Sequence, residues 1–327
     1  MLQGRICAEL RESYRILYSG TEINARVAGR LRHEARSRLD YPAVGDDVLF
    51  EERHGEAVVH GIVPRRSAII RKAAGTAYEG QIIAVNVDYL LIVCALDADF
   101  NVRRIERYAS LAACSGVAPV LVLNKADLCR DLDLKLLELE HITFPIYVLA
   151  AAYGNGIETL QPYLKDTVAL VGSSGAGKST IANALLGEGR QHTAAVRADD
   201  SRGRHTTTSR QLFPLASGGS LIDTPGMREL YLWADADAID DAFGDIETLA
   251  RQCRFSDCAH DSEPGCAVRA ALGDTFDVAR FENYCKLRRE QAYLERKVDA
   301  QAAAQELARW KALHRNAREH VRFKRRQ

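Results

Sequence analysis

The sequence predicts a multidomain protein with three parts: a small N-terminal β-barrel, a central α/β domain and a mostly helical C-terminal domain. Short β-branched runs fill the first 72 residues, and apolar strands alternate with helical segments from residue 81 onward. A cysteine–histidine cluster then precedes a long helical pattern without proline. These patterns are typical of barrels, open parallel sheets and small metal-stabilised domains, respectively. We place the domains at residues 1–75, 76–240 and 241–327.

The composition is that of a chain able to bury a sizeable core, with 327 residues of which 47% are hydrophobic. The first fifteen residues mix acids and bases and lack the apolar centre of a signal peptide. The longest apolar stretch, residues 82–96, is interrupted by Asn86 and Asp88 and is too short to span a bilayer. We therefore expect a cytoplasmic monomer without membrane contact, whose eight cysteines are thiols or metal ligands rather than disulfides.

Charge is distributed unevenly, although the formal net charge is zero. A neutral chain argues against a uniformly basic nucleic-acid binder. Residues 286–327, however, carry thirteen Lys and Arg against five Asp and Glu, a net of +8. On a helix and its frayed end these cations would reach phosphate groups, and a merely solvated tail is the alternative.

The N-terminal runs recur about every ten residues between turn signals, which predicts a small all-β barrel. Five arginines, at positions 26, 30, 32, 36 and 38, occupy one loop-like segment. A barrel of OB type would use them to meet phosphates. An SH3-like or structural barrel with solvated arginines is an equal alternative. The runs are residues 5–7, 14–18, 25–28, 47–50 and 57–59.

The central pattern of strands and helices predicts an open parallel sheet. The expected strands are residues 82–85, 89–95, 120–123, 146–150, 168–171 and 221–222. The expected helices include residues 101–114, 132–139 and 180–186.

A phosphate-binding loop is predicted where the pattern G-x-x-x-x-G-K-[ST] follows an apolar strand and opens a helix. Glycines are needed because N–H groups that converge on a phosphate require backbone conformations that side chains obstruct. Lys178 would reach the β- and γ-phosphates as a catalytic group, and Ser179 would bind Mg²⁺. A glycine-rich turn is the alternative. The loop comprises Gly172, Ser173, Ser174, Gly175, Ala176, Gly177, Lys178 and Ser179, and Thr180 follows it.

A base-recognition tetrad, Asn124-Lys125-Ala126-Asp127, follows the strand at 120–123. The Asp127 carboxylate can accept from the N1–H and the 2-amino group of guanine. Adenine would leave that carboxylate unpaired, at a cost on the order of several kcal/mol. Asn124 would tie the loop to its neighbours, and the stem of Lys125 would cover the base.

Two further segments have the character of nucleotide-sensing switches. Asp223-Thr224-Pro225-Gly226 follows a short strand, so the carboxylate can hold Mg²⁺ through water and the Gly226 N–H can meet the γ-phosphate. The polar stretch 202–208 precedes it, and one of its threonines, Thr206 or Thr207, would complete the Mg²⁺ shell. A polar surface loop is the alternative for that stretch.

The order of these motifs is informative, because the base-recognition tetrad precedes the phosphate loop and the switches. Such an order results if a domain is cut at one loop and rejoined near its old termini. The sequence thus resembles the circularly permuted GTPases, in particular the ribosome-small-subunit-dependent GTPase family. The resemblance implies an enzyme that hydrolyses GTP to GDP, binds the small ribosomal subunit and its RNA, and acts late in subunit maturation. Its flanking domains would grip ribosomal RNA.

One loop departs from that family. Where relatives read Ser-Ala, this chain has Ala150-Ala151. A backbone N–H of Ala151 would still reach guanine O6, although nucleotide affinity would be weaker.

A cysteine–histidine set suited to tetrahedral Zn²⁺ lies within fourteen residues: Cys253, Cys258, His260 and Cys266. Four protein ligands leave no open position for water, so we expect a structural zinc ion. Buried free thiols with an incidental histidine are the alternative. The other five cysteines are interpreted as core or incidental residues.

Catalysis is expected to depend on a partner. The position after Gly226 holds Met227, whose thioether cannot orient an attacking water, so unassisted hydrolysis should be slow, at or below roughly 10⁻⁴ s⁻¹. We name His205 as the residue brought in to position that water. Rival hypotheses are a non-catalytic guanine-nucleotide switch, an RNA-binding module, and a GTP-dependent metal chaperone with the cysteine cluster as cargo site.

Overall fold

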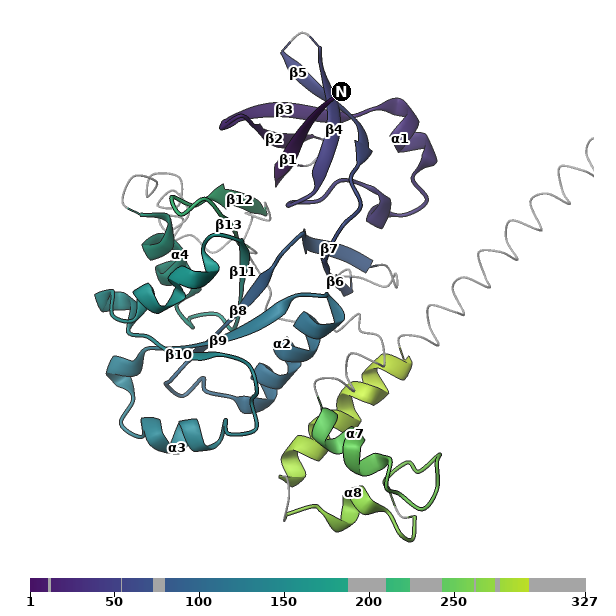
Figure 1. Ribbon diagram of the computed structural model, residues 1–327, viewed down its shortest axis with the longest axis vertical. Coiled ribbons are helices and arrows are strands. Elements are labelled where there is room, and N and C mark those ends of the chain that lie inside the picture. Colours follow the sequence, from purple (N-terminus) through teal and green to yellow (C-terminus); the bar gives the residue numbers. More distant parts are fainter. Residues whose placement is uncertain are drawn as a thin grey trace, which may run out of the picture.

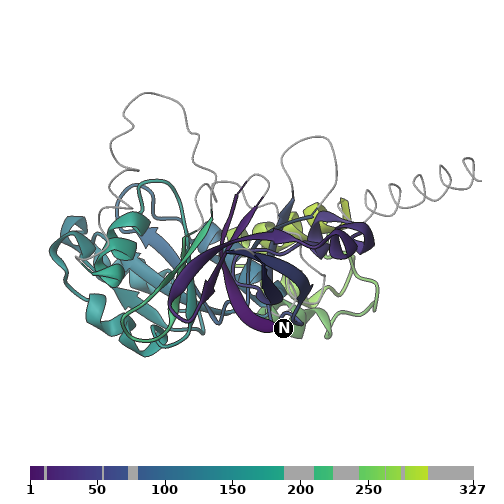
Figure 2. The same cartoon turned by 90° about the horizontal axis from the view of Figure 1, so that it is seen from above.

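The computed structural model describes residues 1–10, 13–53, 55–72, 80–187, 210–223, 243–261, 263–273 and 277–293. The predicted three-part architecture is confirmed: a barrel at the N-terminus, an α/β sheet below it and a helical C-terminal part beside the sheet (Figure 1). In the view from above, the barrel faces the reader between the other two parts (Figure 2). The domain boundaries proposed after residues 75 and 240 lie outside the described residues and stay predictions.

Five strands build the barrel, and each corresponds to one of the five predicted runs, although β3 ends one residue before the run at 25–28 does. Their order is β1-β2-β3-β5-β4, and pairing between β1 and β4 closes the ring. Ile6, Ile16, Phe50 and Val59 fill its interior. This strand order, closed by the pairing of β1 with β4, fits the OB-like arrangement. The strands are β1 (Leu2–Glu9), β2 (Tyr14–Tyr18), β3 (Thr21–Val27), β4 (Asp47–Arg53) and β5 (Glu56–Ile62).

The arginine-rich segment is folded, where the sequence suggested a loop. It contains α1 (Gly29–Glu34) and the short helix η1 (Arg38–Asp40). Ser37 caps η1, and Asp40 Oδ2 accepts from the backbone N–H of Ser37 at 2.8 Å. Arg65 anchors the segment to the barrel, because it pairs with the fully buried Asp46 and donates to the carbonyl oxygens of Leu39 and Tyr41. We call residues 29–41 the basic arm.

The central sheet is parallel across β10-β9-β8-β11-β13, with β12 antiparallel at its edge. β12 also pairs with β1 of the barrel through Ala8 and Gln211, so one sheet continues from the α/β domain into the barrel. The strands are β8 (Tyr89–Ala95), β9 (Ala118–Asn124), β10 (Ile146–Val148), β11 (Thr167–Val171), β12 (Gln211–Pro214) and β13 (Ser220–Asp223). The described helices of this domain are α2 (Val102–Cys114), α3 (Leu132–Leu137) and α4 (Lys178–Leu186), together with the short helices η2 (Ala126–Leu128), η3 (Ala151–Tyr153) and η4 (Ile157–Tyr163).

The strand predicted at 82–85 exists, but its place in the parallel sheet was wrong. It belongs to β7 (Gly80–Val85), which pairs antiparallel with β6 (Ala68–Lys72) in a separate two-stranded sheet. Three residues separate β7 from β8. A parallel neighbour requires a crossover of a dozen or more residues, so β7 and β8 could not pair that way.

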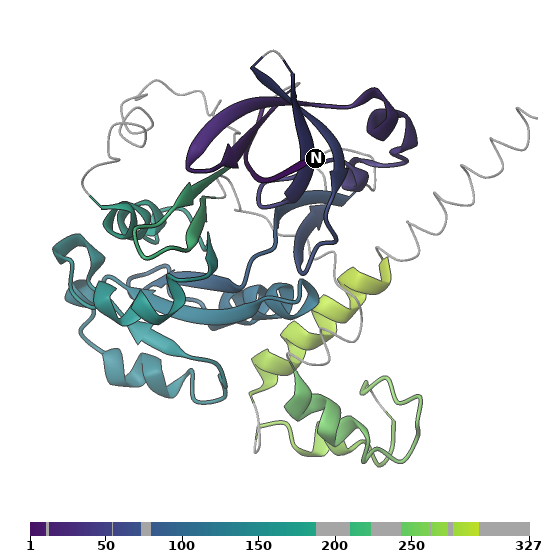
Figure 3. The ribbon, with the colours of Figure 1, turned by 45° about the horizontal axis from the view of Figure 1, so that its top comes forward.

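The C-terminal part packs against α2 of the α/β domain (Figure 3). Its described helices are α7 (Gly244–Ala250), α8 (Ala267–Ala270) and a helix over residues 278–293. Glu106 on α2 is buried and accepts from Arg280 and Asn283 of that last helix, at 2.5 and 2.7 Å. His141 Nε2 lies 3.2 Å from the same carboxylate. Among the described residues, no helix has both the length and the apolarity needed to cross a membrane.

Candidate nucleotide and metal sites

The predicted nucleotide-binding motifs meet at the carboxyl edge of the parallel sheet. The phosphate loop follows β11, Asn124 ends β9 and Asp223 ends β13. β8 and β13 pair with β11 on either side, and β9 pairs with β8. In open α/β sheets, ligands bind at this edge, because the loops that leave parallel strands converge there.

Two glycines of the phosphate loop are required by their surroundings. Gly172 has φ +146°, and a Cβ there would lie 2.1 Å from the carbonyl oxygen of Val93. Gly177 has φ +99°, and a Cβ there would lie 2.0 Å from Nδ2 of Asn124. Any side chain at either position would push apart the strands and loops that form the site.

Asn124 connects the three loops of the site. Its side chain is buried, Nδ2 donates to the carbonyl oxygen of Ala176 at 3.0 Å, and Oδ1 accepts from the N–H of Ala151 at 3.1 Å. One amide thus joins the end of the base-recognition strand to the phosphate loop and to the loop at Ala150-Ala151.

Lys178 begins α4 and lies at the mouth of the phosphate loop. Its Nζ donates to the carbonyl oxygens of Gly172 and Ser173, at 2.8 and 2.5 Å. Ser179 and Thr180 are exposed in the first turn of the helix, as are Ser174 and Gly175 in the loop. A helix N-terminus that follows a glycine-rich loop favours phosphate groups through its backbone N–H groups and its dipole.

The base-recognition residues lie beside this loop. Asp127 is exposed in η2, and Lys125 has the left-handed φ of +63°. Lys125 Nζ pairs with Asp97 Oδ2 at 2.8 Å, a partner that the motif did not suggest. Asp97 and its neighbour Asp99 were missed by sequence reasoning, although polar residues directly after the strand at 89–95 were a signal for this edge.

The remaining predicted nucleotide residues are only partly described. Asp223 is half-buried at the end of β13. His205, Thr206, Thr207 and Gly226 lie outside the described residues, as does Met227. Their expected roles stay predictions.

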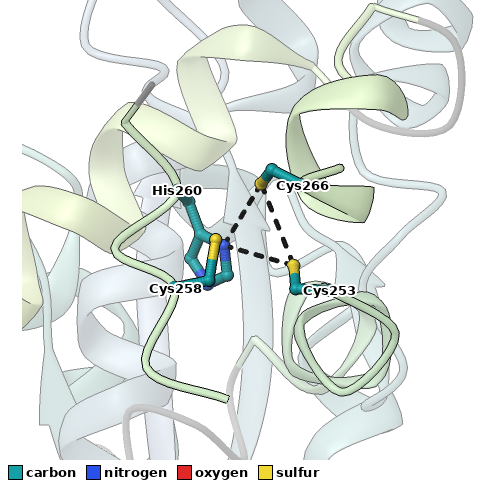
Figure 4. Close-up of side chains that lie close together, drawn as sticks. All are labelled: Cys253, Cys258, His260 and Cys266. Atoms are coloured by element: carbon teal, nitrogen blue, oxygen red, sulfur yellow. Dashed lines mark hydrogen bonds between the residues drawn. The ribbon is translucent and has the colours of Figure 1, made fainter. Parts of the chain in front are cut away.

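The four predicted metal ligands come together in the C-terminal part (Figure 4). The Sγ atoms of Cys253 and Cys266 lie 3.9 Å apart, and they lie 3.6 and 3.4 Å from Nδ1 of His260. Around a tetrahedral zinc ion, two sulfur ligands lie about 3.8 Å apart, and a sulfur and a nitrogen about 3.6 Å apart, given the usual bond lengths. With Cys258, all four ligand atoms lie within 4.8 Å of one another, so the set is compatible with zinc.

Local backbone contacts shape this metal site. Cys266 caps α8 and accepts from the N–H of Arg269 at 3.4 Å. Burial acts to raise the pKa of Cys253, but hydrogen bonds from the N–H groups of Val268 and Ala267 outweigh it and lower that pKa. Glu263 accepts from the N–H groups of Ala259 and Asp261, which holds the loop that carries His260. These contacts favour the thiolate form at Cys253 and hold the loop that carries the imidazole, as a metal site requires.

Burial raises the pKa of cysteines both inside and outside the cluster. All eight are free thiols. Burial raises the pKa of Cys7 to about 12, raises the pKa of Cys94 and of Cys285, and raises the pKa of Cys258, a member of the cluster, to about 11. What distinguishes the cluster is its geometry, since its four ligand atoms lie within 4.8 Å of one another.

Comparison with known proteins identifies the family. The model of the RsgA GTPase family matches residues 62–233. An ABC transporter model matches residues 159–321, and the two matches share the phosphate loop, which many NTPases possess. The chain is 46% identical to the small ribosomal subunit biogenesis GTPase RsgA of Opitutus terrae, over 97% of this chain and 91% of that protein. It is 52% identical to the protein of that name from Xanthomonas oryzae pv. oryzae, over 80% of this chain and 72% of that protein.

Two solved structures share the fold. The crystal structure of YjeQ from Thermotoga maritima has a TM-score of 0.67 and 27% identity, covering 89% of this chain and 98% of that one. The crystal structure of YloQ, described as a circularly permuted GTPase, has a TM-score of 0.64 and 23% identity, covering 89% of this chain and 95% of that one. The predicted permuted fold is therefore confirmed. The chain belongs to the RsgA GTPase family and is a GTP-hydrolysing P-loop enzyme.

Proposed function

We propose that this protein is a GTPase of small ribosomal subunit biogenesis, which hydrolyses GTP to GDP and phosphate and is stimulated by the subunit. The observation that carries the proposal is the Asn124 amide, which joins a guanine-specific tetrad to a phosphate loop in a chain 46% to 52% identical to proteins named for that role. The protein would act in the cytoplasm as a monomer, late in subunit maturation.

The nucleotide would be held from both ends. Asp127 would accept from guanine, Lys178 would meet the β- and γ-phosphates, and Ser179 would bind Mg²⁺ with help from Asp223 and a switch threonine. The Ala151 N–H, expected to reach guanine O6, donates to Asn124 Oδ1, and its exposed neighbour Ala152 offers a second N–H for guanine O6.

The partner would complete the catalytic site. Met227 cannot orient the attacking water, so the enzyme alone turns over slowly, and His205 positions that water once the subunit is bound. The zinc ion would have a structural role, because the four side chains of the cluster fill a tetrahedral shell.

A basic groove on the barrel supports contact with RNA. The groove has a volume of about 810 Å³ and lies between the basic arm, the barrel and the start of β12. Among the described residues, the exposed Arg32, Arg36 and Arg38 have no ion-pair partner. Unpaired guanidinium groups next to aromatic rings suit a nucleic-acid strand, since phosphates meet the charges and bases stack on the rings. The groove is lined by Tyr14, Arg32, Arg36, Arg38, Tyr41 and Arg210, among others.

The proposal is tested by GTP turnover of the purified protein with small subunits, large subunits and naked ribosomal RNA in parallel. We expect small subunits alone to accelerate turnover by about tenfold or more, within the range that a completing group supplies. Unchanged turnover with small subunits would refute the stimulated-GTPase proposal. In the same assay, a His205→Ala variant with full stimulated activity would exclude the role of His205.

The presence of Met227 supports a second candidate function, a guanine-nucleotide switch that sets RNA affinity without useful hydrolysis. Single-turnover kinetics separate the two, since a switch of this kind would show no faster GTP cleavage in the presence of the subunit.

A further inference from the structure

The turn between β8 and α2 carries two carboxylates, Asp97 and Asp99, that belong to none of the nucleotide motifs. The N–H of Asp99 donates to Asp97 Oδ1 at 2.9 Å, which fixes the turn. The other oxygen, Asp97 Oδ2, accepts from Lys125 Nζ at 2.8 Å. This contact, with the N–H of Asp99, holds the pKa of Asp97 below its usual value, so the carboxylate is charged at neutral pH. Asp97 therefore reaches the base-recognition loop.

Asp99 reaches the phosphate loop. Ser173 Oγ donates to Asp99 Oδ2, and Ser173 is the second residue of the loop. Arg104 in the first turn of α2 pairs with the same carboxylate at 2.9 Å and also donates to the carbonyl oxygen of Asp99. The guanidinium offsets the negative charge, so a carboxylate can lie beside this loop without repelling a phosphate group.

These ion pairs are suited to positioning more than to stabilising the fold. The side chains of Lys125 and Asp97 are each 31% exposed, and those of Arg104 and Asp99 are 30% and 34% exposed. Pairs this accessible to water contribute little to folding stability. They do, however, restrict where Lys125 and Ser173 can lie, and both residues belong to nucleotide-binding loops.

We propose that Asp97 and Asp99 are positioning residues for the guanine nucleotide. Asp97 acts at its base and Asp99 at its phosphates. Asp97 holds the ammonium group of Lys125 so that the lysine stem lies against the purine. Asp99 holds Ser173 and with it the first bend of the phosphate loop. The inference rests on GTP binding but not on the ribosomal role.

The two residues should differ in their dependence on the number of phosphates. Replacing Asp97 acts at the base, so Asp97→Asn should speed the release of GMP, GDP and GTP by a similar factor of about tenfold, the change expected for one lost charge-assisted contact. Replacing Asp99 acts at the phosphates, so Asp99→Asn should speed the release of GDP and GTP and leave GMP release unchanged.

The experiment measures release of fluorescent guanine nucleotides from the full chain by stopped flow, with thermal unfolding recorded for each variant. Asp131→Asn is the matched control, because the contacts of Asp131, with Lys135 at 3.8 Å and with the Cys129 thiol at 3.7 Å, lie outside residues 124–127 and 172–179. Asp97→Glu should restore slow release in part, since the charge is kept. In a Lys125→Ala background, Asp97→Asn should have no further effect.

Release within twofold of the unmodified chain for Asp97→Asn would overturn the role of Asp97, as would an undiminished effect without Lys125. If Asp99→Asn speeds GMP release as much as GDP release, the assignment of Asp99 to the phosphates is overturned. A lower unfolding midpoint with unchanged release would mean that the pairs serve stability alone, and would also overturn the proposal. Failure of the unmodified chain to bind GDP would instead refute the GTPase function.

Discussion

A single buried amide, that of Asn124, fixes the spacing between the base-recognition strand and the phosphate loop. The close approach of Gly177 to Asn124 makes this arrangement sensitive to one methyl group. Gly175 lies in the same loop at φ +83°, and a Cβ added there would meet nothing within 4 Å. Alanine at Gly175 would therefore have a similar backbone strain to alanine at Gly177 but no steric clash.

We predict that Gly177→Ala weakens GDP binding at least about tenfold more than Gly175→Ala. Both variants place alanine at positive φ, which costs about 1–2 kcal/mol, but only Gly177→Ala displaces Asn124 and breaks its two buried hydrogen bonds. Titration with fluorescent GDP checks this. Equal losses for the two variants would mean that Asn124 does not set the loop spacing.

At this scale the sequence predicted the motifs and the connecting role of Asn124, but not the carboxylates that contact these loops. Gly172, Lys178 and Asn124 were found because each chemistry requires a residue type at a fixed spacing. Asp97 and Asp99 were not found, because their partners Lys125 and Ser173 are distant in the chain and become neighbours only when β8 pairs with β9 and β11.

Among the elements, the basic arm differs most from expectation. Its arginines suggested a loop, since its apolar residues are too few to mark a helix face, and α1 buries no residue. The arm is ordered by contacts that sequence periodicity does not reveal: the cap formed by Ser37 and Asp40, and the Arg65–Asp46 pair.

We predict that replacing Arg32, Arg36 and Arg38 together with alanine weakens small-subunit binding. The slope of log K against log salt concentration should become shallower by roughly two. The matched control replaces Arg15, Arg30 and Arg53, whose guanidinium groups already form ion pairs with Glu22, Glu34 and Glu51. Binding measured across a salt series distinguishes the sets. Equal weakening by both triple variants would indicate a general charge effect and no specific role for the groove.

The loops of the cysteine–histidine cluster, compatible with zinc, are the second element with a clear test. We predict that Cys266→Ser reduces zinc content from about one ion per chain to near zero and lowers the unfolding midpoint by roughly 10 °C or more, because zinc binding supplies folding free energy. Cys285→Ser, outside the cluster, should retain the zinc. Atomic emission and thermal unfolding measure both. Full zinc content in Cys266→Ser would refute the four-ligand site.

For the whole molecule, the sequence predicted three parts but not how they join. The joint between the C-terminal part and α2 depends on Glu106, a carboxylate on a predicted helix whose partners Arg280 and Asn283 lie far along the chain. The joint between barrel and sheet depends on β12, a short strand that the sequence did not reveal.

We predict that Arg280→Met destabilises the protein by about 3–5 kcal/mol, because Glu106 is 4% exposed and would lose its main cation. The double variant Arg280→Met with Glu106→Gln should recover much of that loss, since no buried charge then remains unpaired. Chemical unfolding of the full chain gives both values. A double variant no more stable than the single one would show that the buried charge is not the source of the loss.

The pairing of β12 with both β13 and β1 has a mechanical consequence. β12 lies between the two predicted switch stretches in the sequence, and its Gln211 pairs with Ala8 on one side and with Asp223 on the other. The barrel is thus joined to the GTPase domain at a strand that lies next to both predicted switch stretches. A force applied to the barrel by a bound RNA would be delivered as torque on β13, the strand that ends at Asp223, which we propose as a Mg²⁺ ligand.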